Sequence, residues 1–287
     1  MTAQAADKQS LLEGARVYLS GPMDFVQNRE EEAKSGWRTR VGELLRSYGV
    51  IVFDPWTKPE VRGLQEYGRE TAESADARHR WRFDDTEEGA EARSKITGKY
   101  WETLHIDLRM VDTCDFVVAF CPTNIYSVGT PHEIALARQQ RKPVLFVSPS
   151  VDFPALDALR EHLKSDAEGT RLLAELEGQV PIKRNPRGIP SLWYMPLVGP
   201  QSFFDGFGFD HGDLRQRFGW TESALDELER RRPPQRPLLP LLEKLRYELP
   251  KKWDSRRNTW VRNDDWLLWD LERDGEAGAE VTGARGT

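Results

Sequence analysis

The chain has 287 residues, of which 31% are charged and 38% are hydrophobic, and its formal net charge is −6. This length suits one large domain or a domain with an appendage, and the small net charge indicates no class of partner. No apolar run approaches the roughly 18 residues that span a bilayer, and the first residues lack the pattern of a secretion signal. We therefore expect a cytoplasmic protein without a membrane partner.

The first elements alternate between strand and helix. Residues 17–20 form a short apolar strand that Gly21-Pro22 ends. A helix is predicted from Glu30 to Tyr48, where apolar residues recur at spacings of three and four, and Gly49 is placed to end it. A second buried strand follows at 50–53. Strand, helix and strand in this order predict a parallel crossover.

The regular pattern resumes after a charged stretch at 57–99, which we interpret as an insertion that forms a helical excursion or a lid. The elements expected beyond the insertion are a helix at 100–113, a strand at 116–120, a helix at 130–140, a strand at 144–147 and a fifth strand within 192–198. Continuous apolar strands between amphipathic helices predict a doubly wound, Rossmann-like α/β fold with a mainly parallel five-stranded sheet.

The chain is expected to divide into three parts. Residues 14–200 would form the α/β domain with its 57–99 insertion, residues 201–270 a basic, tryptophan-rich region with a helical appendage, and residues 271–287 a disordered tail. Basic and aromatic residues in the second part could bind single-stranded nucleic acid by pairing with phosphates and stacking on bases. Tryptophans at this density are more often the core of a small helical appendage or a subunit interface; they are Trp253, Trp260, Trp266 and Trp269.

Cysteine and histidine give no sign of a metal centre. Cys114 and Cys121 are seven residues apart across a predicted strand, which places them on opposite faces, so we expect no disulfide. No cysteine–histidine cluster has the spacing of a zinc site. We expect neither a metal nor a cofactor.

Ligands of such sheets bind outside the carboxyl ends of the strands. The loops that follow the first and third predicted strands should therefore line the site. Their candidate binding residues are Ser20, Gly21, Pro22, Met23 and Asp24 in the first loop, and Tyr126, Ser127, Gly129 and Thr130 in the second. Tyr126 could stack on a base or pack against the insertion.

Two carboxylates lie near these loops in the sequence. Glu133 follows Thr130 and Pro131, which are the expected N-cap and first residue of a helix. It could be a capping-box glutamate that bonds back to the N–H of Thr130. Asp107 lies in the preceding helix and could be part of a solvated face. Together, at the carboxyl edge of a parallel sheet, the two carboxylates indicate chemistry at a sugar carbon.

The joint pattern resembles the nucleoside 2-deoxyribosyltransferase superfamily, which includes base-exchanging transferases and deoxynucleoside 5′-monophosphate N-glycosidases. The resemblance covers roughly residues 16–149, with the 57–99 insertion outside it. The matching segments are, in order, Tyr18-Leu19-Ser20-Gly21-Pro22, Ile106-Asp107-Leu108, Asp115-Phe116-Val117-Val118-Ala119, Ser127-Val128-Gly129-Thr130 followed by Glu133, and Lys142-Pro143-Val144.

This resemblance implies a double displacement. Glu133 would attack the anomeric carbon of a (deoxy)nucleoside or its 5′-monophosphate and expel the base, forming a glycosyl ester that passes to water or to a second base. Asp107 would assist protonation of the leaving base, and Tyr18 would orient Glu133 or the sugar. Relatives often complete the site across a dimer interface, so a homodimer or higher homo-oligomer is expected.

Ser127 bears on the choice of substrate. Transferases that act on free nucleosides usually carry aspartate at this position, whereas the monophosphate N-glycosidases carry a serine that contacts the 5′-phosphate. A hydroxyl suits a phosphate that an aspartate would repel, so Ser127 favours a nucleotide. Those glycosidases have an arginine where this chain has Asp24, so the phosphate would need another partner, such as Arg29, Arg109 or a residue of the insertion.

Two other functions are compatible with the same sequence. One keeps the fold and the chemistry but acts on NAD or a modified nucleotide. The other is a non-catalytic nucleotide sensor whose C-terminal region contacts a partner.

Overall fold

The computed structural model describes residues 10–23, 26, 28–69, 80–179, 184–186, 188, 190–209, 236–263 and 266. Asp24, Trp269 and the tail expected at 271–287 lie outside the described residues, as does the middle of the 201–270 region. Within the described part of the chain, no helix has both the length and the apolar character that crossing a bilayer would require.

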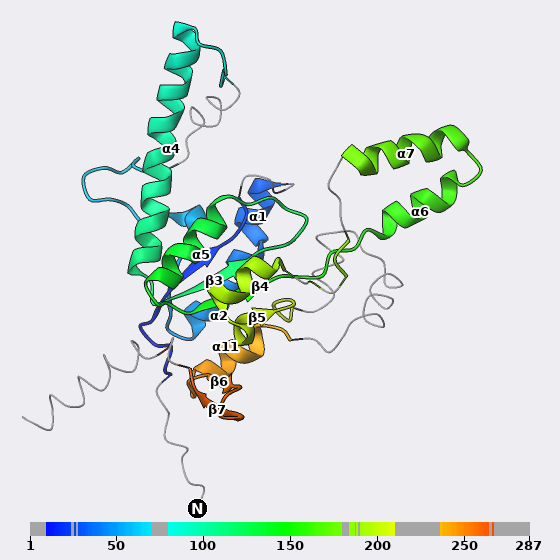
Figure 1. Cartoon of the computed structure of the whole chain (residues 1–287). Helices are drawn as coiled ribbons and strands as arrows, with labels where there is room; N and C mark the ends of the chain where they lie inside the picture. The colour runs from blue at the N-terminus through cyan, green and yellow to red at the C-terminus, as the bar shows by residue number, and fades with distance from the viewer. Residues whose placement is uncertain are drawn as a thin grey trace, which may run out of the picture.

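The centre of the fold is a sheet of five parallel strands in the order β2-β1-β3-β4-β5 (Figure 1). The strands are β1 (Arg16–Ser20), β2 (Ile51–Phe53), β3 (Phe116–Phe120), β4 (Val144–Val147) and β5 (Phe203–Phe204). The predicted doubly wound α/β fold is therefore confirmed. The strand order reverses between β1 and β3, and in open α/β sheets this switch point is where ligands bind.

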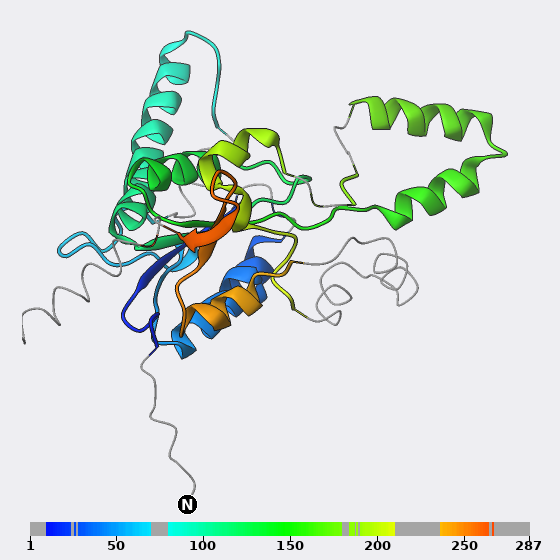
Figure 2. The same cartoon turned by 60° about the horizontal axis from the view of Figure 1, so that its bottom comes forward.

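Helices cover both faces of the sheet because successive strand side chains point in opposite directions. Val17 and Leu19 belong to the core that α2 (Trp37–Ser47) and α11 (Leu239–Leu245) complete. Tyr18 and Val117 belong to the core beneath α4 (Glu87–Thr113), α5 (Gly129–Gln139) and α8 (Met195–Val198). Figure 2 shows these two helical layers on either side of the sheet.

The helix predicted from Glu30 to Tyr48 is two helices, α1 (Arg29–Ser35) and α2. They are separated at Gly36, whose backbone is extended and passes so close to the carbonyl of Glu32 that a Cβ would lie only 2.2 Å from its oxygen. Periodicity did not reveal this break because the apolar positions of α2 dominate the pattern. Gly49 ends α2 as predicted, in the left-handed region with φ +81°.

The fifth strand was predicted in the wrong segment. Residues 192–198 form a 3-10 turn, η2 (Leu192–Tyr194), and the short helix α8. Ser191 accepts a hydrogen bond from the N–H of Trp193 at the start of the turn, and Pro196 has no N–H to give to a sheet. The strand that pairs with β4 is the two-residue β5, which follows η3 (Pro200–Ser202).

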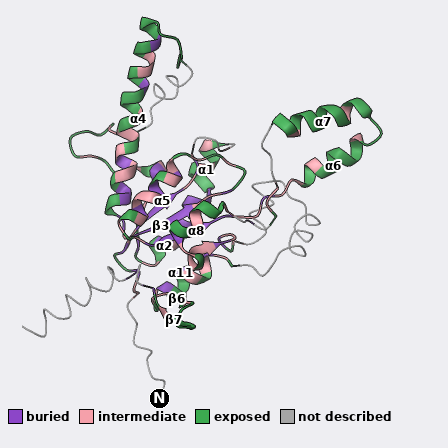
Figure 3. Cartoon of the chain, in the orientation of Figure 1, coloured by how far each residue is buried: buried purple, intermediate pink, exposed green. Residues whose placement is uncertain are grey.

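Helix α4 contains the second half of the predicted insertion. It begins at Glu87, where the Thr86 hydroxyl accepts a hydrogen bond from the N–H of Gly89 at 3.1 Å, and it runs without interruption into the helix predicted at 100–113. Its C-terminal half is anchored in the core by Ile106, Met110 and Val111. Its N-terminal half stands clear of the sheet and is mostly exposed (Figures 1 and 3).

The described C-terminal residues pack against the α/β core. Leu242 and Leu245 of α11 are buried beside α2, and the ring of Trp266 lies 5.7 Å from that of Phe116. Trp253 and Trp260 face each other across the hairpin of β6 (Lys251–Asp254) and β7 (Thr259–Arg262). The remaining helices, α6 (Pro154–Leu163) and α7 (Ala167–Gln179), project from the body after β4 (Figure 1).

Candidate active site

A cavity of about 670 Å³ opens at the carboxyl ends of β1 and β3. Five segments form its walls: the loop after β1, the segment before α4, the outer and middle parts of α4, the loop between β3 and α5, and the first residues of α5. The described lining residues are Gly21, Met23, Trp81, Ile96, Thr97, Tyr100, Trp101, Thr103, Leu104, Asp107, Tyr126, Ser127, Val128, Gly129, Thr130, His132 and Glu133. The cavity thus lies where the sequence pattern placed the site.

Glu133 is the fifth residue of α5, with its carboxylate directed at β1. Its side chain is buried, with 7% of the residue exposed. Oε1 accepts a hydrogen bond of 2.8 Å from the Tyr18 hydroxyl, and Oε2 accepts one from the Ser20 hydroxyl. Tyr18 and Ser20 are two residues apart on β1 and therefore share a face. The structure brings these three predicted site residues together.

The first turn of α5 is not built as predicted. The helix begins at Gly129 after Val128 rather than at Pro131 after a Thr130 N-cap. The Thr130 hydroxyl is buried and lies 2.8 Å from that of Ser127. No side-chain hydrogen bond caps this helix, so Glu133 is not a capping-box residue. Its carboxylate is held by the sheet instead.

Burial raises the pKa of Glu133 above its ordinary value. The hydroxyls of Ser20 and Tyr18 oppose this shift, as do the positive charges of Arg38 and Lys58. Burial and the negative charge of Glu133 also raise the pKa of Tyr18, so that this hydroxyl remains a donor. The result is a carboxylate that is desolvated and oriented, with a raised pKa.

Asp107 lines the same cavity from α4 and has a cationic partner behind it. The Lys58 ammonium lies 2.8 Å from Oδ1 of Asp107 and donates to the carbonyl of Thr103 at 3.2 Å. The Lys58 side chain is only 6% exposed and that of Asp107 only 13%. Burial raises the pKa of Asp107 to about 7, although Lys58 lowers it, and the charge of Glu133 raises it further. Asp107 can therefore both release and accept a proton near neutrality.

Arg38 fixes the loop after β1 and was missed from sequence. Its side chain is completely buried and donates to the carbonyl of Leu19 in β1 at 3.1 Å and to two carbonyls of the loop, those of Gly21 at 2.6 Å and Pro22 at 3.2 Å. Burial lowers its pKa, and the charge of Asp54 opposes that shift. A signal was present, because Arg38 shares the apolar face of α2 with Val41 and Leu45.

The two predicted loops contribute unequally. Gly21 and Met23 line the cavity, whereas Pro22 is buried outside the lining. Tyr126, Ser127, Gly129 and Thr130 all line it. Tyr126 is 67% exposed, so its ring surface is available to a ligand.

One wall was missed entirely from sequence. The outer part of α4 and the segment before it contribute an apolar and aromatic surface, formed by Trp81, Ile96, Tyr100, Trp101 and Leu104. A signal existed here too, because Ile96, Tyr100, Leu104 and Asp107 recur at helical spacing.

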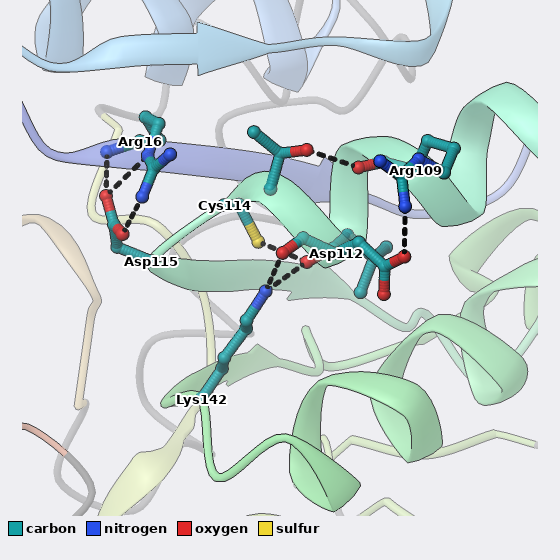
Figure 4. A network of polar contacts seen from close by, with 8 residues as sticks. Arg16, Arg109, Asp112, Cys114, Asp115 and Lys142 are labelled. Carbon is teal, nitrogen blue, oxygen red and sulfur yellow. Dashed lines mark hydrogen bonds and ion pairs between the residues drawn. The ribbon is translucent and has the colours of Figure 1, made fainter. Parts of the chain in front are cut away.

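The arginines considered as phosphate partners lie elsewhere. Arg109 pairs with Asp112 on the same helix at 3.1 Å and belongs to a polar network with Lys142 and Arg16 at the opposite edge (Figure 4). Arg29 lies over the ring of Trp56 at 5.2 Å. Neither arginine lines the cavity.

Nothing in the described part of the chain resembles a metal centre, since no group of three histidine, cysteine or acidic side chains could hold an ion. Cys114 and Cys121, at the two ends of β3, are both free thiols.

Comparison with known proteins finds similar chains among the solved structures. No protein-family model matches the chain, and no curated protein matches it. A solved structure of a 2-deoxyribosyltransferase from the psychrotolerant bacterium Bacillus psychrosaccharolyticus is similar, with 19% identity, a TM-score of 0.26 and coverage of 50% of this chain and 80% of that chain. We base no functional conclusion on a similarity of this size.

Proposed function

We propose that the protein breaks the N-glycosidic bond of a (deoxy)nucleoside or its 5′-monophosphate through a covalent intermediate on Glu133. The observation that supports this most directly is that a buried carboxylate and a largely buried one line the same cavity. One is oriented by the hydroxyls of Tyr18 and Ser20. The other, Asp107, has a pKa of about 7. A nucleophile and a proton donor with different environments are what glycoside chemistry requires.

In the first step, a carboxylate oxygen of Glu133 forms a bond to the anomeric carbon while the bond from that carbon to the base nitrogen breaks. The electron pair of the broken bond goes to the base, which takes a proton from Asp107. Such positioned proton transfer contributes on the order of 10²–10⁴-fold. In the second step, water or another base attacks the same carbon, Glu133 leaves, and Asp107 recovers a proton from the attacking group.

Ser127 and the N-terminus of α5 are the proposed site for a 5′-phosphate. The Ser127 hydroxyl lies at the cavity wall beside Gly129, the first residue of α5. Backbone N–H groups at a helix N-terminus favour an anion. With no described lysine or arginine in the lining, this phosphate would depend on hydroxyl and backbone donors.

The test is base release followed by chromatography. Purified protein would be incubated with nucleosides, their 5′-monophosphates and NAD, with and without a free acceptor base. Base release that disappears in Glu133→Gln and persists in Glu161→Gln, a matched change at an exposed glutamate, would support the proposal. Turnover that persists in Glu133→Gln would contradict it. No base release from any compound, together with a ligand-dependent rise in the melting temperature, would indicate a nucleotide sensor instead.

The phosphate assignment has its own test in Ser127→Asp. A carboxylate at this position would repel a phosphate and accept hydrogen bonds from a sugar, so the ratio of kcat/KM for monophosphate over nucleoside should fall at least tenfold. An unchanged ratio would contradict the proposal that the 5′-phosphate binds beside Ser127.

A further inference from the structure

The cavity extends well beyond its two carboxylates along one face of α4. Ile96, Tyr100 and Leu104 lie on this face at intervals of four residues, and Asp107 follows three residues later. We call this face of α4, from Ile96 to Asp107, the strip. Asp107 lies eleven positions after Ile96, so at 1.5 Å per residue the strip is about 16 Å long. A two-ring nucleobase placed beside Asp107 would cover only its inner part.

The cavity is divided by polarity. Its two carboxylates, from Asp107 and Glu133, lie at the inner end near the sheet with the hydroxyls of Ser127 and Thr130, whereas Thr97 and Tyr100 carry the hydroxyls of the outer part. The outer end is bounded by Ile96 and Tyr100 on α4 and by Trp81 before it. Small-molecule sites commonly combine such an apolar wall with a few polar groups that fix orientation.

Charge limits what the outer end can hold. Among the described lining residues there is neither a lysine nor an arginine. The pyrophosphate of a dinucleotide would have no cationic partner there, and burying an unpaired charge is costly. The outer end therefore suits an uncharged, apolar group.

We propose that the substrate is a nucleoside or nucleoside 5′-monophosphate whose base carries an uncharged hydrophobic substituent, and that this substituent occupies the outer strip of α4. The inference rests on the proposed function, because Asp107 places the leaving base at the inner end of the strip. A substituent on that base then points along α4 toward Ile96 and Trp81. These two residues, with Tyr100, determine specificity rather than catalysis.

The aromatic side chains at the mouth support a flat substituent. Trp101 is 58% exposed and Trp81 is 37% exposed, although both line the cavity. Ile96 is only 6% exposed despite its place on the projecting half of the helix. One face of the Trp101 ring is stacked on His105, and the exposed parts of the two rings offer an aromatic surface against which another ring can pack.

Substrate preference is the direct test. The rates of base release would be compared for 2′-deoxyadenosine and N6-benzyl-2′-deoxyadenosine, for the corresponding cytosine pair with an N4-benzyl group, and for their 5′-monophosphates. Since a single methylene in an apolar pocket changes kcat/KM by about 10–200-fold, the benzyl compound of at least one pair should be preferred by tenfold or more. Equal or lower kcat/KM for every benzyl compound would overturn the inference.

Variants connect the preference to the strip. Ile96→Ser and Trp81→Ala should bring the ratio of kcat/KM, benzyl over unsubstituted, close to one. Trp193→Ala is the matched control, because Trp193 is 84% exposed and outside the cavity lining; it should leave the ratio unchanged. If the ratio stays at its wild-type value in both Ile96→Ser and Trp81→Ala, the substituent does not bind along this face of α4.

A binding measurement separates this inference from the proposed function. Calorimetry with the Glu133→Gln protein would compare N6-benzyladenine with adenine, and N4-benzylcytosine with cytosine. Tighter binding of a benzyl base without any turnover would retain the ligand class and reject the activity. Turnover without a preference for the benzyl compounds would retain the activity and reject the proposed ligand class. Sedimentation would detect a third outcome, a dimer that Trp81→Ala dissociates, which would make the strip a subunit interface and overturn the inference.

Discussion

The hydroxyl of Tyr18 donates a hydrogen bond of 2.8 Å to Glu133, a residue 115 positions later in the chain. The bond joins the middle of β1 to the N-terminal part of α5. It forms because β1 and β3 are neighbours in the sheet, with Tyr18 paired to Val117, so that the helix following β3 begins beside the end of β1. The pairing of two strands thus fixes the orientation of the proposed nucleophile.

Tyr18→Phe should reduce turnover without removing it. The variant loses a donor to a buried carboxylate, so the pKa of Glu133 rises further and a smaller fraction of Glu133 is ionised at a given pH. A hydrogen bond to a charged group is worth about 1.5–3 kcal/mol, which corresponds to a fall in kcat/KM of roughly 10–200-fold. The rising limb of the pH–rate profile should move to higher pH.

Tyr48→Phe is the control for this substitution. Its hydroxyl also donates to a carboxylate, Oε2 of Glu243 at 2.5 Å, but on the surface away from the cavity. The control should keep the wild-type profile. A Tyr18→Phe profile that coincides with the wild-type one would show that Glu133 does not depend on this bond.

Lys58→Met should move the falling limb of the profile to higher pH. Base expulsion needs Asp107 protonated, and burial already raises its pKa to about 7. Loss of an opposite charge at this distance raises a carboxyl pKa by about 1–3 units, so protonated Asp107 persists to higher pH. Lys58→Arg should leave the limb near its original position. The same pKa can be followed without turnover through the carboxyl 13C shift of Asp107.

The pair of substitutions Asp107→Asn and Lys58→Met should change the pH dependence of stability. A carboxyl whose pKa is raised on folding holds a proton that the unfolded chain has released. Its contribution to the free energy of unfolding is therefore present at pH 4 and lost as the pH rises toward 7. Replacing a buried ion pair by neutral groups of similar size is often neutral or stabilising by about 1–4 kcal/mol.

Urea unfolding at pH 5 and pH 8 measures this effect. The double variant should show a smaller difference between the two values than the wild-type protein, with the gain at pH 8. A difference equal to that of the wild-type protein would mean that Asp107 titrates alike in the folded and unfolded states.

The parts of the fold that the sequence revealed are those with local signals. Four strands are runs rich in β-branched and aromatic residues, and the carboxyl-end rule predicted that the loops after β1 and β3 meet, as they do in the cavity. β5 could not be found this way, because a two-residue strand exists only through its pairing with β4. The role of Lys58 could not be predicted either, because its partner Asp107 lies 49 positions later and only tertiary packing brings the two side chains together.

Gly21 directly follows β1 and lines the cavity. A Cβ at this position would lie 2.8 Å from Cζ2 of Trp37 and 3.2 Å from the carbonyl oxygen of Phe120. Trp37 cannot move aside easily, because its ring packs between Phe120 and Phe207 at centroid distances of 5.2 and 5.3 Å. In Gly21→Ala the loop must shift instead. Overpacking of this kind costs about 1–3 kcal/mol.

Gly98→Ala is the contrasting change on α4. A Cβ there would meet nothing within 4 Å, and replacing an exposed glycine inside a helix stabilises by roughly 0.5–1 kcal/mol. Thermal unfolding should therefore shift in opposite directions for the two variants. Gly21→Ala should also lower kcat/KM, because the shifted loop carries Ser20 away from Glu133. Wild-type stability and turnover in Gly21→Ala would show that the loop tolerates the added methyl group and does not set the position of Ser20.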